Sequence, residues 1–164
     1  MRAISLWQPW ATAIAVGAKR IETRGWSTDY RGPLAIHAAR RCIVDEMLYY
    51  GATWQWCYAL APIGKRMGDG NYLDKILPFG AIVATCLLDD CRPTDSFTQA
   101  ELDAPRRHPG GSEHEFWTER MMGNFDLGRF GWALTEIRAL PRPIPFKGRQ
   151  GFFSVRDELL RVAA

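Results

Sequence analysis

The sequence predicts an α+β fold in which five or six short strands are combined with one early helix and further helices at the sheet edges. Polar and apolar residues alternate over 20–24 and 33–38, as they do in half-buried strands. Residues 80–88 are apolar on both faces, which is typical of a covered central strand. Residues 9–17 carry apolar side chains at helical spacing. A small β-barrel with helical decoration fits the same pattern equally well.

The composition is that of an ordinary globular protein, since 47% of the 164 residues are hydrophobic and 24% are charged. No apolar run reaches the roughly 20 residues of a membrane helix, and no signal peptide is recognisable, so we expect a cytoplasmic protein without membrane contact. The net charge of +3 does not by itself indicate nucleic acid. None of the four cysteines lies in a Cys-x-x-Cys pair, so we expect no metal and no other cofactor.

The first elements are predicted to be a strand over 1–5, a helix and a second strand over 20–24. Pro9 suits the first position of the helix, where the missing N–H costs nothing. Gly17 is expected to end the helix in the left-handed conformation. In the second strand, Ile21 and Thr23 are predicted to face the core and the charged residues to face the other way.

The short helix brings Lys19, Glu22 and Arg24 close together, next to the turn formed by Gln8, Pro9 and Trp10. An amide and large aromatic rings beside a compact charge cluster suit a flat polar ligand. The alternative is a solvated surface cluster, whose ion pairs contribute about 0–1 kcal/mol.

The strand predicted over 33–38 places His37 on the face opposite to Leu34, Ile36 and Ala38. His37 would contact a ligand or transfer a proton if that face lines a pocket, and would otherwise be hydrogen-bonded near the core. Residues 41–57 have helical composition, and residues 62–74 read as a loop.

The next strand, over 80–88, is predicted to end at the acidic pair Asp89-Asp90, which we interpret as a solvated strand end. Residues 91–125 are irregular, with a short helix after Thr98 and a second one starting near Glu113. A long irregular connection of this kind is often a binding loop.

The last part of the chain is predicted to form a strand over 129–137, a proline-rich extended connector over 141–145, a strand over 152–155 and a closing helix over 156–162. Between them lies a glycine-flanked turn with exposed donors, among them Lys147 and Gln150.

Six segments in this order resemble the ASCH domain family of the PUA-like superfamily. They are Ser-Leu-Trp-Gln-Pro-Trp-Ala at 5–11, Gly-x-Lys-x-x-Glu-x-Arg at 17–24, Tyr-Arg-Gly-Pro-Leu-Ala-Ile-His-Ala at 30–38, Phe-Gly-Ala-Ile-Val-Ala-Thr at 79–85, Phe-Gly-Trp-Ala-Leu at 130–134 and Lys-Gly-Arg-Gln-Gly-Phe-Phe at 147–153. The resemblance implies a PUA-like small β-barrel with helical decoration and a cleft beside the first helix. It also implies one domain over 1–164 with inserted segments at about 41–77 and 91–127.

The resemblance implies an RNA or modified-nucleoside ligand, with DNA as a further partner, and in some family members a hydrolytic activity. The first hypothesis is an RNA-binding domain that acts as a ribonuclease on single-stranded RNA. Lys19, Arg24 and Lys147 would hold phosphate, and Glu22 or His37 would move protons. The predicted catalytic residues are Lys19, Glu22, Arg24 and His37, and the predicted substrate-binding residues are Gln8, Trp10, Trp26, Lys147 and Gln150.

Two alternatives stay open. One is an amidohydrolase that acts on N4-acetylcytidine-type nucleosides; similar relatives carry a threonine nucleophile where this chain has Glu22, and Thr23 is one place away. The other is a non-catalytic reader of nucleic acid or of a modified base, which would use the same cleft.

Overall fold

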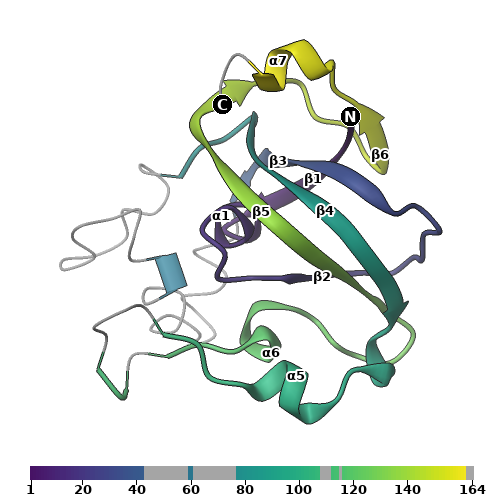
Figure 1. Cartoon of the computed structure of the whole chain (residues 1–164), viewed down its shortest axis with the longest axis vertical. Helices are drawn as coiled ribbons and strands as arrows, with labels where there is room; N and C mark the ends of the chain where they lie inside the picture. The colour runs from purple at the N-terminus through teal and green to yellow at the C-terminus, as the bar shows by residue number, and fades with distance from the viewer. Residues whose placement is uncertain (43–58, 61–76, 108–111, 115, 162–164) are drawn as a thin grey trace.

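The computed structural model describes residues 1–42, 59–60, 77–107, 112–114 and 116–161. Six strands form one curled sheet in the order β2-β5-β4-β3-β1-β6 (Figure 1). The strands are β1 (Arg2–Gln8), β2 (Ile21–Arg24), β3 (Gly32–Cys42), β4 (Ala81–Pro93), β5 (Phe130–Pro145) and β6 (Phe152–Ser154). The helices are α1 (Trp10–Ala15), the 3-10 turn η1 (Thr94–Ser96), α5 (Gln99–Asp103), α6 (Glu119–Met122) and α7 (Asp157–Arg161).

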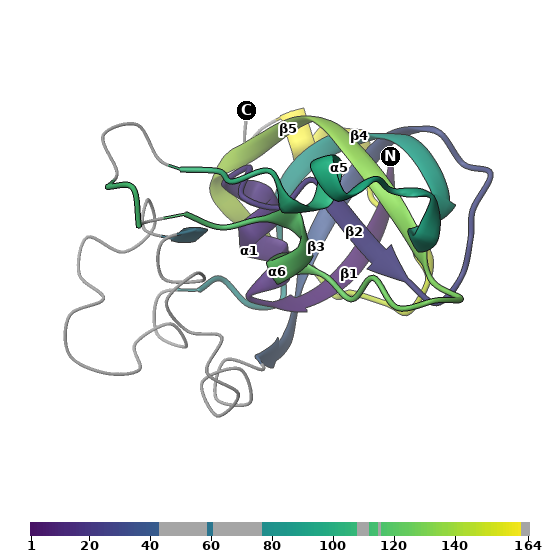
Figure 2. The same cartoon turned by 90° about the horizontal axis from the view of Figure 1, so that it is seen from below.

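The sheet is mixed, because β1 runs parallel to β3 while β3–β4, β4–β5, β2–β5 and β1–β6 are antiparallel pairs. The chain therefore crosses over through α1 and β2 between the two parallel strands, as parallel pairing requires a connection of this kind. Helix α1 contacts β1, β3, β4 and β5, so it packs against the inside of the curl (Figure 2).

The main hydrophobic core lies between α1 and the strands around it. Ile14 of α1 is fully buried and belongs to one cluster with Ile36, Val83 and Trp132 from three different strands. Cys86 lies in the same cluster, and burial raises the pKa of its thiol to about 12, so it packs as a small apolar side chain.

These observations confirm the predicted fold class and the central position of β4, which lies between β3 and β5. Gly17 has φ +75° and ends α1 as expected. Pro9 lies one residue before the helix, and its carbonyl accepts a hydrogen bond from the Ala13 N–H at 2.9 Å. The Thr98 hydroxyl caps α5, whose residue Glu101 completes a capping box.

Several predicted ends are wrong. Strand β4 continues past Asp89-Asp90 to Pro93, because Asp90 and Cys91 still pair with β5 and the Asp90 carboxylate bonds Arg31 at 3.1 Å. The proline-rich connector forms the end of β5, paired with β4 through Pro145. The helix expected near Glu113 begins only at Glu119, after the capping residue Thr118.

The helix predicted from residue 41 also starts too early, because β3 extends through Cys42. The rest of that helix and most of the loop over 62–74 lie outside the described residues. Among the described residues, no helix is both long enough and apolar enough to cross a membrane.

Candidate functional site

A cluster of charged side chains begins at Lys19, close after α1. The Lys19 side chain is 1% exposed, and its ammonium donates hydrogen bonds to the carbonyls of Ile21 at 2.5 Å and Met122 at 2.9 Å. Its nitrogen also lies 3.6 Å from a carboxylate oxygen of Glu22. The three donors of the ammonium are therefore matched by three protein oxygens. Lys19 holds β2, α6 and Glu22 together, and this geometry gives no support to a phosphate contact by Lys19.

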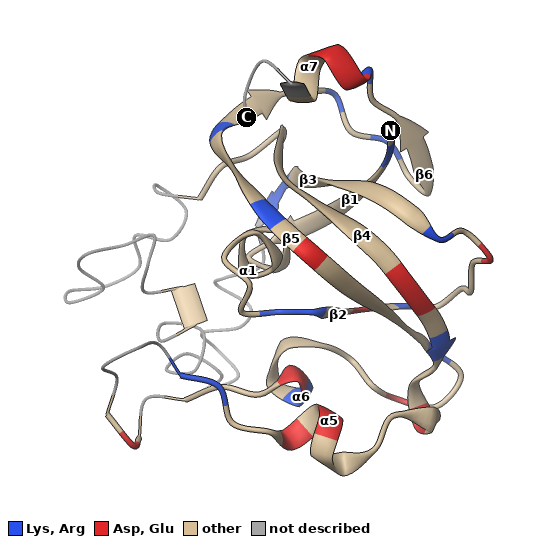
Figure 3. Ribbon diagram, viewed as in Figure 1, with Lys and Arg blue, Asp and Glu red and all other residues tan. Residues whose placement is uncertain are grey.

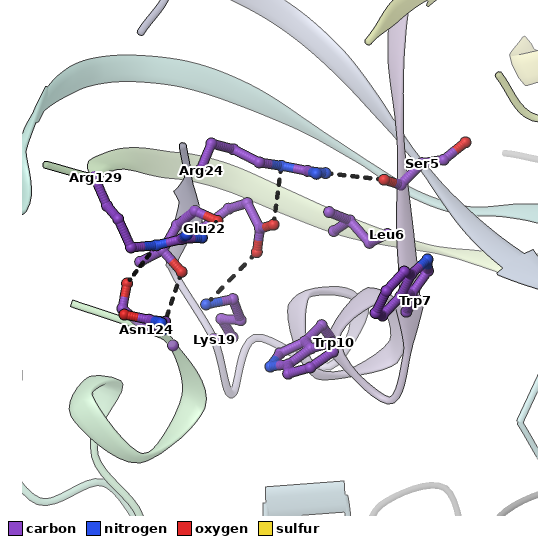
Figure 4. Close-up of a pocket in the computed structure, with 11 residues that line it drawn as sticks. Ser5, Leu6, Trp7, Trp10, Lys19, Glu22, Arg24, Asn124 and Arg129 are labelled. Atoms are coloured by element: carbon purple, nitrogen blue, oxygen red, sulfur yellow. Dashed lines mark hydrogen bonds and ion pairs between the residues drawn. The ribbon is translucent and has the colours of Figure 1, made fainter. Parts of the chain in front are cut away.

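The buried carboxylate of Glu22 lies between two cations. One oxygen faces Lys19, and the other lies 3.2 Å from Nε of Arg24 (Figure 4). The Arg24 guanidinium donates a further hydrogen bond to the backbone carbonyl of Ser5 at 2.8 Å. Strand alternation explains the arrangement, because Glu22 and Arg24 share one face of β2 while Ile21 on the other face packs with Phe97 and Leu102.

The charged cluster of Lys19, Glu22 and Arg24 forms one wall of a cavity of about 280 Å³, which we call the tryptophan cavity. Trp7 of β1 and Trp10 of α1 lie across from the charged side chains (Figure 4). The full lining is Ser5, Leu6, Trp7, Trp10, Lys19, Glu22, Thr23, Arg24, Gly123, Asn124 and Arg129. Aromatic surface on one side and fixed polar groups on the other are typical of small-molecule sites.

The segment after α6 forms another wall of the tryptophan cavity. The Asn124 N–H donates to the Thr23 hydroxyl at 3.1 Å. The Arg129 guanidinium donates to the carbonyls of Asn124 at 3.2 Å and Thr23 at 3.3 Å. Two anchors fix the Arg129 side chain in place, so its position does not depend on a ligand.

A second, more open cavity of about 770 Å³ lies next to the first and shares Ser5 and Trp7 with it. We call it the basic cavity, since Arg40, Lys147 and Arg149 line it and no acidic residue does. Figure 3 shows the basic residues on the segment between β5 and β6, where no acidic residue occurs. Among the ion pairs within the described ranges, none involves these three cations.

His37 of β3 lies at the inner wall of the basic cavity and is 2% exposed. Its Nδ1 is 3.0 Å from the Ser5 hydroxyl oxygen, and its Nε2 is 3.0 Å from the Phe146 carbonyl oxygen. Burial lowers the pKa of His37, and the hydrogen bond to Phe146 opposes that effect in part.

The ASCH domain model matches residues 4–125, about three quarters of the chain. The chain belongs to the ASCH domain family. The crystal structure of ASCH from Zymomonas mobilis superposes with a TM-score of 0.50 over 98% of this chain and 90% of that one, at 16% sequence identity. A tyrosine-to-phenylalanine variant of the same protein gives a TM-score of 0.49 at 16% identity, covering 98% and 94% of the two chains. The likeness to the unaltered Zymomonas mobilis protein shows a shared fold. No curated protein sequence matches the chain.

Seven of the nine expected site residues of this ASCH domain line one of the two cavities, and three of them, His37, Lys147 and Gln150, line the basic cavity. Lys19, Glu22, Arg24 and Trp10 line the tryptophan cavity. The two remaining residues, Gln8 and Trp26, lie outside both cavities.

Gln8 is fully buried, and its amide bonds the Pro78 carbonyl at 2.7 Å and the Thr12 N–H at 3.1 Å. It therefore fixes the turn before α1 from inside. Trp26 contacts the ring of Trp132 edge to face, with centroids 4.7 Å apart, and covers the core.

Sequence reasoning missed several lining residues that the fold brings in from separate segments, among them Trp7, Arg40, Asn124, Arg129 and Arg149. A signal exists for Trp7, because alternation along β1 puts it on the same face as Ser5. Asn124 and Arg129 follow the irregular segment, where no periodicity marks a face. Among the described residues, no cluster of three or more histidine, cysteine or acidic side chains is arranged to hold a metal.

Proposed function

We propose that this ASCH domain binds single-stranded RNA, with one base in the tryptophan cavity and the adjoining phosphates in the basic cavity. The observation that carries the proposal is the pair of adjacent cavities, which share Ser5 and Trp7 but differ in chemistry. An aromatic slot beside a cationic surface matches the alternation of bases and phosphates along a single strand.

The tryptophan cavity suits one planar base. Its volume of about 280 Å³ lies just below the usual range of ligand sites, about 300–1,000 Å³, so a single base fits better than a whole nucleotide. Trp7 is 44% exposed and offers a ring for stacking. The Glu22 carboxylate is an acceptor for a base N–H, and the Lys19 and Arg24 contacts hold it in place.

The basic cavity suits phosphates, because Arg40, Lys147 and Arg149 have no acidic partner among the described residues. Each phosphate neutralised on a single strand contributes about 0.7 to the slope of log affinity against log salt. Three contacts predict a slope of about −2.

The test is fluorescence anisotropy of a labelled single-stranded RNA over a range of salt concentrations. Alanine at both Lys147 and Arg149 should make the slope shallower by about 1.4. The control is Arg138→Ala, which removes an exposed cation from another surface and should leave the slope unchanged. Affinity that does not change with salt would contradict the proposal.

A second candidate function is hydrolysis of an N4-acetylcytidine-type base. The observation that favours it is the small size of the tryptophan cavity, where a carboxylate and the Thr23 side chain both line the wall. Incubation with N4-acetylcytidine at high protein concentration, followed by chromatography, should then yield cytidine and acetate, and Glu22→Gln should abolish the reaction. Absence of cytidine would leave RNA binding as the function. Cleavage of RNA would also need the Glu22 carboxylate as a base. Gel analysis of the RNA recovered from the binding assay tests directly whether the protein cleaves it.

A further inference from the structure

Ser5, His37 and the Phe146 carbonyl form a continuous line of hydrogen bonds across the basic cavity. The Ser5 hydroxyl oxygen lies 3.0 Å from Nδ1 of His37, and Nε2 of the same ring lies 3.0 Å from the Phe146 carbonyl oxygen. Figure 4 shows the Ser5 hydroxyl pointing away from Lys19 and Glu22. This line is therefore a separate cluster from the charges of the tryptophan cavity.

The hydrogen bonds define the tautomer of His37. A carbonyl oxygen only accepts, so Nε2 must carry the proton that it donates to Phe146. Burial lowers the pKa of His37 and keeps the ring neutral near pH 7, which leaves a lone pair on Nδ1. The Ser5 hydroxyl then donates to Nδ1. An activated serine nucleophile has this arrangement: its hydroxyl donates to one nitrogen of a neutral imidazole, and an acceptor holds the other nitrogen in place.

The surroundings of this pair also fit a reaction centre. Gly148 lies directly over it, since a Cβ at this position would be 2.5 Å from the Ser5 hydroxyl oxygen and 2.3 Å from Cε1 of His37. Only glycine lets the backbone approach this closely. Arg40, Lys147 and Arg149 line the same cavity and supply positive charge for a developing oxyanion.

The geometry points to a second activity at the basic cavity: Ser5 is the nucleophile and His37 the general base in the hydrolysis of a carboxylic ester that carries an anionic group. This goes beyond RNA binding and does not depend on it. The three cations select the anionic group and leave the ester next to Ser5.

The steps balance with water as the only co-reactant. The Ser5 oxygen bonds to the ester carbonyl carbon while its proton moves to Nδ1 of His37. The tetrahedral intermediate collapses, the bond from carbon to the alcohol oxygen breaks, and His37 returns the proton to the departing alcohol. Water then attacks the acyl-serine with His37 as base, which releases the carboxylic acid and restores Ser5.

The test uses two activated esters, 4-nitrophenyl acetate and the anionic 4-nitrophenyl succinate. We expect a burst of nitrophenolate, and peptide mapping after an acid quench should find the succinyl group on Ser5. Ser5→Ala should abolish the burst, and His37→Gln should slow it about 100-fold. Alanine at both Lys147 and Arg149 should slow the succinate ester about tenfold more than the acetate ester, because only succinate carries the anionic group.

The matched control is Ser154→Ala, which removes an exposed serine outside both cavities and should leave the burst intact. Mapping is done on the unaltered protein, so the result does not depend on the folding of a variant. An acyl group on a lysine only, or no acyl-serine at all, overturns the inference. RNA binding is measured separately by anisotropy, so its loss and the loss of this activity are distinguishable.

Discussion

The Arg24 guanidinium donates a hydrogen bond to the backbone carbonyl of Ser5 at 2.8 Å, although three strands separate β2 from β1 in the sheet. The contact is possible because the sheet curls until its β2 edge comes back to face β1 (Figure 2). It also joins the two cavities, since Arg24 lines the first and Ser5 lines both. The Arg24 side chain therefore holds β2 against β1 and at the same time forms part of the site.

Lys19→Met tests whether the buried ammonium is structural. The substitution leaves the carbonyls of Ile21 and Met122 without their donor and Glu22 without one of its two cations. Removing one partner of a buried ion pair costs about 3–5 kcal/mol, so we expect the free energy of unfolding to fall by about 3 kcal/mol in urea titrations. The exposed Lys147→Met should leave stability within about 0.5 kcal/mol and weaken RNA binding instead. Equal stabilities of the two variants would contradict this assignment.

Gly148→Ala tests the close approach of the backbone to Ser5 and His37. The new Cβ would lie 2.3 Å from Cε1 of His37, so the segment must shift away from β3. Overpacking of this kind costs about 1–3 kcal/mol, and thermal unfolding should show a loss in this range. At Gly25 a Cβ meets no atom within 4 Å, so Gly25→Ala serves as the control and should unfold at nearly the same temperature as the original protein. A Gly148→Ala variant of unchanged stability would mean that the segment is not pressed against His37.

Local sequence signals predicted the framework of the fold. Two-sided apolarity predicted the central position of β4, and Gly17 at the end of a helical pattern predicted the left-handed residue that ends α1. The ends of β4 and β5 were not predictable in the same way. Asp90 and Pro145 are poor strand residues, and both are kept in the sheet by pairing with a distant strand.

The site could be predicted from the sequence only in part, because some of its residues come from distant segments. Lys19, Glu22 and Arg24 lie within one segment of six residues, so their proximity could be predicted from the sequence. Asn124 and Arg129 reach the same cavity through hydrogen bonds to Thr23, about a hundred residues earlier, and no local pattern encodes such contacts. The burial of Lys19 also depends on α6, which supplies the Met122 carbonyl.

His37 predicts a pH dependence of stability. Its pKa in the folded state is lowered from 6.5 by burial, so the unfolded chain takes up the proton more readily. The contribution of the neutral ring is fully present above about pH 6.5 and is lost as the pH falls from there toward the folded pKa. The charged groups that line the same cavity as His37 are Arg40, Lys147 and Arg149.

Urea unfolding at pH 8 and pH 5 measures this effect as a difference between variants. The original protein should lose more stability between the two pH values than His37→Gln does, while the exposed His114→Gln should behave like the original. Subtracting the loss measured for one protein from that of another cancels the contribution of the carboxylates, which all three proteins share. An equal loss in His37→Gln would show that the ring is not held neutral.

Trp7 provides the sharpest test of base stacking. The Arg41 guanidinium lies 4.1 Å from the centre of its ring and covers one face, and the ring lines both cavities. Stacking of one base on an aromatic ring is worth about 1–3 kcal/mol, so Trp7→Ala should weaken binding of single-stranded RNA roughly 5- to 150-fold in anisotropy titrations. Trp7→Phe keeps an aromatic face and should recover most of the affinity. Leu127→Ala removes an exposed apolar side chain elsewhere and should bind as before. If Trp7→Ala binds as tightly as Leu127→Ala, the base does not stack on Trp7.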